Sequence, residues 1–253
     1  MHIISTRFKL KLLPLMLPLK SPCLHKPGHR AFTLLEMLVV IAIIAVLALL
    51  ALPAAQRMLA KGHTANAAGN LRQIGVLMSL YTAENNNCLP LLLDWGGGWY
   101  PPWQALLSRS AGLREDTSTT LFFDDCFYDP AVKESKQHPY GGFGGNDAMI
   151  MDAASCQSAF GHRQGAPLTL IGPLSQKVIV ASAADSAGSR FDSSWFFYGD
   201  LFAAQGSSLT VPKPAPRHSG KTLCLFADGH TEQLDTDNMT AEERRKYFQR
   251  NAN

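Results

Sequence analysis

Three side chains that could do chemistry together lie near the C-terminus. His218 is followed after nine residues by Asp228, and His230 comes two positions later. Imidazole and carboxylate groups suit a transition metal if they meet around one hairpin. Asp228 and Gly229 also form a dipeptide typical of a two-residue turn between strands, and His218 could simply bond a backbone carbonyl. These three residues are therefore metal candidates with a simpler structural explanation, and we expect no metal or other cofactor.

Other catalytic patterns are missing from the sequence. It contains no HExxH motif, no GxSxG motif and no spacing typical of a Ser-His-Asp triad. Asp124 and Asp125 form an acidic pair in a predicted loop, and no partner is expected for them. We therefore expect a protein that is not an enzyme.

Glu36 is a single carboxylate at the start of a long apolar run. Residues 37–53 carry no charged or polar side chain, and the run over residues 32–55 is long enough for a membrane-spanning helix, which needs about 20 residues. A buried core helix is the alternative. An unpaired charge in lipid costs a few kcal/mol, so Glu36 needs a partner unless it stays wet at the headgroups. Pro53 clashes with the carbonyl of Leu49, which predicts a kink or local loosening.

Charge divides the 253-residue chain into a basic leader and a mildly acidic body. The leader, residues 1–31, holds six basic residues and no acidic one, whereas the whole chain has 23 basic and 20 acidic residues. A basic leader ahead of an apolar run is typical of membrane targeting. The basic residues are not interleaved with a predicted fold, so nucleic acid is not an expected partner.

The residues around this junction resemble a known processing signal. Arg30-Ala31-Phe32-Thr33-Leu34-Leu35-Glu36 and the apolar run are similar to the prepilin-type cleavage and methylation motif of type IV pilins and type II secretion pseudopilins. The resemblance implies that a prepilin peptidase cuts between Ala31 and Phe32 and methylates the new amine of Phe32. Ala31 stands where most of the family has Gly. The resemblance also implies that Glu36 neutralises the terminal amine of a neighbouring subunit. Opposite charges in lipid cost less free energy when they are paired.

A second resemblance lies at the other end of the chain. The nine residues between His218 and Asp228-Gly229 reproduce the H-X9-DG signature of a processing-associated region found in many bacterial pilin-like proteins. Leu71-Arg72-Gln73-Ile74-Gly75 and Tyr81 also resemble the helix extension of that group. The region of about 90–175 resembles the group only loosely.

Periodicity extends the helix beyond Pro53. Apolar residues recur at steps of mostly three and four, which predicts an amphipathic stripe that packs on a head domain; they are Met58, Ala65, Ala68, Leu71, Ile74, Met78 and Tyr81. Later segments predict strands over 177–181 and 195–198, a hairpin over 222–226 and 230–234, and a helix that opens with the Thr240–Glu243 capping box. The Gly-rich segment 140–147 is predicted to be a loop that binds no phosphate.

These elements give an α+β, pilin-like fold, with a long N-terminal helix packed on a small antiparallel head. We expect a cleaved leader at 1–31, a transmembrane half-helix at 32–55, an amphipathic extension at 56–84 and an exported head domain at 85–253. Cys88, Cys126, Cys156 and Cys224 remain after cleavage and permit two disulfides in three possible connectivities. A free buried thiol is equally plausible for Cys224.

The expected function is that of a structural subunit. The protein would span the bacterial inner membrane once, with its leader in the cytoplasm and its head outside, and would assemble with other pilin or pseudopilin subunits through Glu36 and Pro53. The alternative is a tethered module that is processed in the same way, never polymerises, and binds a metal or a carbohydrate. The aromatic loop with Trp95, Trp99 and Trp103 could stack a sugar, although such residues more often cap a small core.

Overall fold

The structure is a computed structural model that describes residues 33–92, 102–113, 124–150, 165–186, 189, 191–208 and 210–250. Its helices are α1 (Leu34–Glu84), α2 (Trp103–Ser110), α3 (Asp147–Ile150), α4 (Gly199–Gln205) and α5 (Ala241–Phe248). Its strands are β1 (Phe143–Asn146), β2 (Val178–Ala184), β3 (Phe196–Phe197), β4 (Lys213–Pro214), β5 (Thr222–Phe226) and β6 (Thr231–Leu234). By backbone contacts the chain divides into two compact units, residues 1–49 and 50–253.

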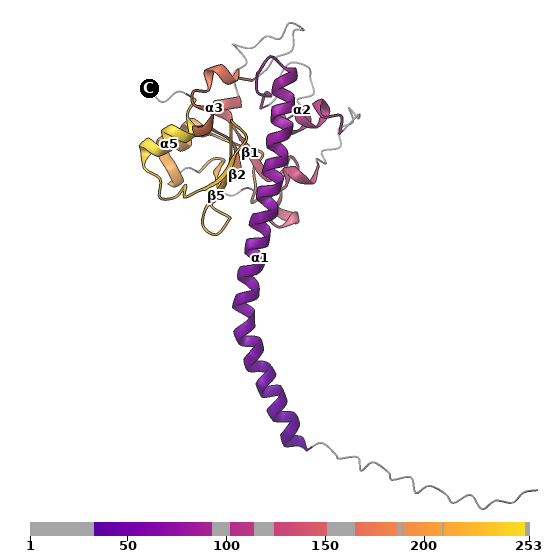
Figure 1. The fold of residues 1–253 in the computed structure, drawn as a ribbon. Coiled ribbons are helices and arrows are strands. Elements are labelled where there is room, and N and C mark those ends of the chain that lie inside the picture. Colours follow the sequence, from indigo (N-terminus) through magenta and orange to yellow (C-terminus); the bar gives the residue numbers. More distant parts are fainter. Residues whose placement is uncertain are drawn as a thin grey trace, which may run out of the picture. The chain divides into compact units, whose positions relative to one another are not determined.

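Helix α1 runs for 51 residues and continues through Pro53 without a break (Figure 1). The boundary between the two units falls between Leu49 and Leu50, one helical turn before that proline. A proline has no N–H to donate to the carbonyl four residues earlier, so the Leu49 carbonyl loses its helical donor. The long helix expected from the sequence is confirmed.

The part of α1 that packs on the head is shorter than the apolar stripe predicts. The first buried side chain along α1 is Ala67, and Leu71, Ile74, Met78 and Tyr81 follow on the same face. Met58 and Ala65 also belong to the predicted stripe, but they are exposed in the structure, Met58 by 73%. The stripe was therefore wrong at its N-terminal end, because helical periodicity alone does not show where the covering domain ends.

The head is built on one sheet with the strand order β3-β1-β2-β5-β6, and β4 pairs with β2 beside this path. The β1–β2, β2–β4, β2–β5 and β5–β6 pairs are antiparallel. The β1–β3 pair is parallel, with Gly145 opposite Phe196 and Asn146 opposite Phe197. The sheet is thus mixed, which corrects the antiparallel expectation; the chain reaches β3 after a long connection rather than a hairpin.

Strand β1 lies in the Gly-rich segment that was expected to be a loop. Its glycines permit a close approach between strands: a Cβ added at Gly144 would lie 2.6 Å from the Cβ of Ala183. Glycine has no side chain to supply the β-branched or aromatic pattern on which a strand prediction depends. The prediction of a loop was therefore wrong here.

Two apolar clusters hold the head together. The larger cluster joins the buried face of α1, the N-terminal residues of α2 and one face of the central strands; its largest members include Trp103, Phe127 and Phe143. The smaller cluster joins β2, β3, β5, β6, α4 and α5; its largest members are Phe197, Phe202, Phe226 and Phe248. Trp103 is fully buried and donates from Nε1 to the Trp195 carbonyl at 2.9 Å, so it is a core residue.

The last helix is tied to the sheet by buried polar groups. The ammonium of Lys177 donates to the carbonyls of Lys246 and Gln249 at 2.8 and 2.6 Å. The side-chain amide of buried Asn146 donates to the carbonyls of Val178 and Phe248. The predicted capping box of this helix is present, with Glu243 N–H donating to Thr240 Oγ1 at 3.2 Å and Thr240 N–H to Glu243 Oε2 at 2.8 Å.

Candidate functional site

The first candidate site is the beginning of α1, where Glu36 forms a capping box with Thr33. Glu36 Oε2 accepts hydrogen bonds from Thr33 N–H at 2.9 Å and from Thr33 Oγ1 at 3.0 Å, and Thr33 Oγ1 accepts from Glu36 N–H at 3.2 Å. These bonds satisfy donors that a helix N-terminus otherwise leaves unpaired. The carboxylate therefore has a partner within its own chain. Ala31 and Phe32, at the proposed cut, lie outside the described residues.

The helix that follows Glu36 presents apolar side chains on all sides. Every described residue from Thr33 to His63 is exposed, including Leu34, Ile41, Leu49 and Leu52. By length and composition this is a helix that could cross a membrane. A helix that is apolar all round and exposed among the described residues suits lipid rather than water, which argues against the buried core helix that was the alternative.

The second candidate site is the C-terminal signature, and the structure explains its spacing. The nine residues between His218 and Asp228 comprise the turn Ser219-Gly220-Lys221, the five residues of β5, and Ala227. His218 pairs with Lys221 through both backbone hydrogen bonds at the start of β5. Asp228 and Gly229 form the turn from β5 to β6, and Gly229 adopts a φ of +91°. The predicted hairpin with an Asp-Gly turn is confirmed.

The metal hypothesis is not supported by this geometry. His218 and Asp228 lie at opposite ends of a five-residue strand, and such a strand spans about 17 Å. Asp228 Oδ1 instead accepts from its near neighbour His230, at 3.1 Å from the backbone N–H and 2.5 Å from Nδ1. The His230 ring stacks on Phe226 with centroids 4.1 Å apart. Within the described residues, no group of three or more metal-ligating side chains is present.

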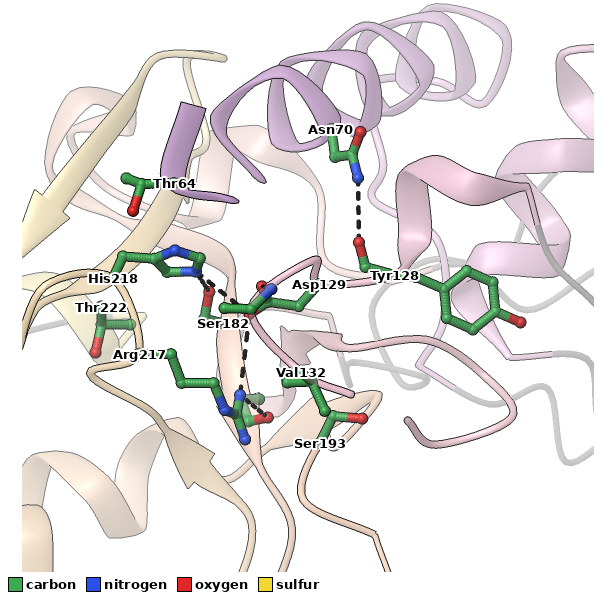
Figure 2. A network of polar contacts seen from close by, with 12 residues as sticks. Thr64, Asn70, Tyr128, Asp129, Val132, Ser182, Ser193, Arg217, His218 and Thr222 are labelled. Carbon is green, nitrogen blue, oxygen red and sulfur yellow. Dashed lines mark hydrogen bonds and ion pairs between the residues drawn. The ribbon is translucent and has the colours of Figure 1, made fainter. Parts of the chain in front are cut away.

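His218 belongs to a buried polar cluster that the sequence did not predict. Its Nε2 lies 3.0 Å from Ser182 Oγ on β2 and 3.3 Å from Asp129 Oδ2. Arg217 approaches the same carboxylate oxygen at 4.0 Å and donates to the Ala183 carbonyl at 2.8 Å. Figure 2 shows these side chains converging between β2 and the segment that contains Asp129.

Electrostatics keep Asp129 ionised in this cluster. Burial of the carboxyl group favours its neutral form and would raise its pKa, but the hydrogen bond and charge of His218, the Ala131 N–H bond and the charge of Arg217 together outweigh that effect. The net result is a pKa below the ordinary value of 3.8. The Arg217 pKa is lowered by burial, which the charges of Asp129 and Asp192 oppose.

The cluster contains Ser, His and Asp but is not arranged for nucleophilic catalysis. In a catalytic triad the serine and the carboxylate contact opposite ring nitrogens, whereas Ser182 and Asp129 both contact Nε2 of His218. The other ring nitrogen, Nδ1, is buried without a hydrogen-bond partner. The ring proton is assigned to Nε2, because this nitrogen faces the carboxylate. The side chains of His218 and Asp129 are fully buried, so the arrangement is that of a core network.

The cysteines also have a structural role where they are described. Cys126 and Cys224 are buried free thiols, so a framework of two disulfides is wrong and the buried thiol is the correct alternative for Cys224. Burial raises the pKa of Cys126 to about 11 and raises that of Cys224 well above the usual range. Cys156, Trp95 and Trp99 lie outside the described residues.

Comparison with known proteins identifies one match. A family model described as the prokaryotic N-terminal methylation motif matches residues 26–52. These residues include the proposed cut, Glu36 and most of the apolar run. The match supports a type IV pilin-like protein that is processed by a prepilin peptidase. No curated protein and no solved structure matches the chain.

Proposed function

We propose that the protein is a pseudopilin-like structural subunit, which a prepilin peptidase processes and which then assembles into a filament of the type II secretion or type IV pilus kind. The observation that carries this proposal is the start of α1: a single carboxylate, followed by a helix whose apolar side chains are exposed within the described part of the chain. The match to the methylation motif over the same residues supports it.

Processing would create a positively charged partner for Glu36. A cut before Phe32 leaves a terminal amine that is four residues before Glu36 in the sequence. In a neighbouring copy the same amine would be available to the carboxylate across the interface, and pairing reduces the cost of both charges in lipid. The cap on Thr33 shows that the carboxylate can be satisfied before assembly.

We further propose that the leader lies in the cytoplasm and that the residues beyond the apolar segment lie outside, so that the head is exported from the inner membrane. The cluster around His218, with the signature turn at Asp228-Gly229, would serve the stability of that head. The runner-up function is a tethered binding module with the same processing that does not polymerise. The role of Glu36 distinguishes the two functions, because a helix that only anchors the protein needs no carboxylate at this position.

Two substitutions in the capping box distinguish the effect of the negative charge of Glu36 from the effect of its hydrogen bonds with Thr33. Glu36→Gln keeps an oxygen that can accept from Thr33 but removes the negative charge, and Thr33→Ala removes part of the cap but keeps the charge. Cells that express a prepilin peptidase would produce each full-length variant, and intact mass would report a mature chain that begins with N-methylated Phe32. Crosslinking of membrane fractions would report multimers.

The proposal expects all variants to be processed and inserted. It expects Glu36→Gln and Glu36→Leu to lose multimers, and Thr33→Ala to keep them. Multimers of the Gln variant at the wild-type level would show that the charge of Glu36 is not an assembly contact, and a wild-type protein that forms no multimers would favour the tethered module. A mature chain that begins at residue 1, or at a site other than Phe32, would contradict the pilin-like function itself.

A further inference from the structure

An open groove lies beside the part of α1 that packs on the head. It has a volume of about 440 Å³ and is lined by Gln73, Val76 and Leu77 of α1, by Leu113 and by Asp124, Asp125 and Cys126. Its floor is apolar: Val76 is 69% exposed and Leu113 54%. Apolar side chains exposed at this level, rimmed by charge, mark an interaction surface.

Two carboxylates, those of Asp124 and Asp125, lie at the rim of the groove. Asp125 is exposed, and Asp124 uses one oxygen to accept from Ser108 Oγ at 2.9 Å. Among the ion pairs of the described residues, none involves either carboxylate. The two aspartates also help to raise the Cys126 pKa, in addition to the larger effect of its burial, so their field acts on the groove. An occupant with positive charge next to an apolar side chain would complement this groove.

Another segment of α1 has that composition. Arg57 and Lys61 are exposed one turn apart, and Met58 lies between them with 73% of its surface exposed. Like charges at this spacing repel each other, and no carboxylate of the described part of the chain pairs with either. The chain thus carries an unpaired basic and apolar patch on α1, here called the basic patch, and an unpaired acidic and apolar groove, here called the acidic groove.

The two surfaces cannot meet within one chain. Met58 and Val76 belong to the same continuous helix, and at 1.5 Å per residue about 27 Å separates them along its axis. This separation is close to five turns, so both side chains lie on the same face of the helix. The basic patch of one copy can nevertheless reach the acidic groove of a second, parallel copy that is displaced along the axis.

We propose that the acidic groove binds the basic patch of a second copy of this chain, with Lys61 and Arg57 facing Asp125 and Asp124, and Met58 on Val76 and Leu113. The contact is heterologous, because it joins two different surfaces. In a pair of copies, one acidic groove and one basic patch therefore remain unoccupied. A heterologous contact that does not close propagates as an open chain of subunits. The proposal rests on the proposed function and gives it a specific contact outside the apolar segment.

The test uses two tagged full-length copies, expressed together with a prepilin peptidase, one with Met58→Cys and the other with Val76→Cys. Mild oxidation of membranes should give a crosslinked pair of the two tags. Copies without an introduced cysteine control for the native thiols. A pair with Met58→Cys in both copies, or Val76→Cys in both, should crosslink far less. A dominant Val76–Val76 crosslink would indicate a symmetric face-to-face dimer and overturn the proposal.

Charge reversal tests whether Asp125 of one copy faces Lys61 of the other. Asp125→Lys in the Val76→Cys copy, or Lys61→Glu in the Met58→Cys copy, should lower the crosslinked yield by about fivefold, and both changes together should restore it, since each surface ion pair contributes modestly. Asp237→Lys, at an exposed acid away from the groove, should have no effect. If multimers form and depend on Glu36 but ignore these reversals, this contact is refuted and the filament function stands. If wild-type copies form no multimers, the proposed function fails first.

Discussion

His218 Nε2 lies 3.3 Å from Asp129 Oδ2, and both side chains are fully buried although 89 residues separate them in the sequence. The histidine of the C-terminal signature is therefore a core group that fastens the start of β5 to the segment around Asp129. It belongs to a buried polar network with Ser182, Asp129 and Arg217. The first prediction follows from this contact.

Removal of Asp129 should strongly destabilise the head. Asp129→Ala leaves Arg217 largely buried without its carboxylate and His218 Nε2 with Ser182 alone, and removing one partner of a buried pair costs about 3–5 kcal/mol. Urea unfolding of the full-length protein in detergent, followed by tryptophan fluorescence, measures this loss. Asp237→Ala is the matched control, because this aspartate is exposed and takes part in no ion pair of the described residues, and surface substitutions of this kind change stability by at most about 0.5 kcal/mol. Equal effects of the two changes would contradict the assigned role.

The same carboxylate predicts a dependence of stability on acid. The pKa of folded Asp129 is lower than its ordinary value of 3.8, so its ionised form stabilises the fold above that value. This stabilisation is lost as the pH falls from 3.8 through the lower folded pKa. The difference in free energy of unfolding between wild type and Asp129→Asn should therefore be constant at neutral pH and should narrow below about pH 4. A difference that instead changes most near neutral pH would assign the effect to another group.

Substitution of Gly229 and of Gly69 by alanine should have opposite effects on the stability of the head. A Cβ at either position meets open space, but Gly229 has a φ of +91° whereas Gly69 is helical. Gly229→Ala should destabilise the head by about 1–2 kcal/mol through backbone strain. Gly69→Ala should stabilise it by up to about 1 kcal/mol, because alanine is the better helix former. Melting temperatures of the two variants, compared with that of the wild type, test these expectations. An unchanged melting temperature for Gly229→Ala would show that the turn can relax to accept the new side chain.

Cys224 should resist thiol reagents while the head is folded. Its thiol is buried between β2 and β6 and its pKa is raised by burial and, to a lesser extent, by the charge of Glu232, so little reactive thiolate forms near neutral pH. Maleimide labelling followed by peptide mass spectrometry should find Cys224 unmodified in the native protein and labelled in urea. Rapid native labelling of Cys224 would show that this part of the sheet opens. The introduced cysteines at positions 58 and 76 would serve as exposed controls.

Local sequence signals predicted the parts of the fold that local physics determines. The long helix, the Asp-Gly hairpin and the capped last helix each carry their signal within a few residues, and the structure confirms them. Thr33 and Glu36 have the same spacing as Thr240 and Glu243, so the capping box at the start of α1 could have been predicted by the same rule. The apolar run after Glu36 instead favours an interpretation that depends on the charge of this residue.

Contacts between residues that are far apart in the sequence could not be predicted from local patterns. Nothing near Asp129 indicates that it meets His218 and Arg217, because the contact depends on how β2 and the loops beside it are brought together. Strand β1 consists largely of glycine, which has no pattern of its own and is required only by the neighbouring Ala183 and Phe196. The parallel β1–β3 pair likewise arises from the connection between distant segments.

The bonds of Lys177 and Asn146 to the last helix have a consequence for the order of biosynthesis. Both side chains lie in or beside the central strands, yet their acceptors include the carbonyls of Lys246, Phe248 and Gln249. A chain interrupted after Thr240 would lack α5, which supplies these acceptors and contributes Phe248 to the smaller apolar cluster, so we expect its head to be unstable. We therefore expect the head to become stable only after α5 has been synthesised, and a chain that ends before this helix to remain open to proteases.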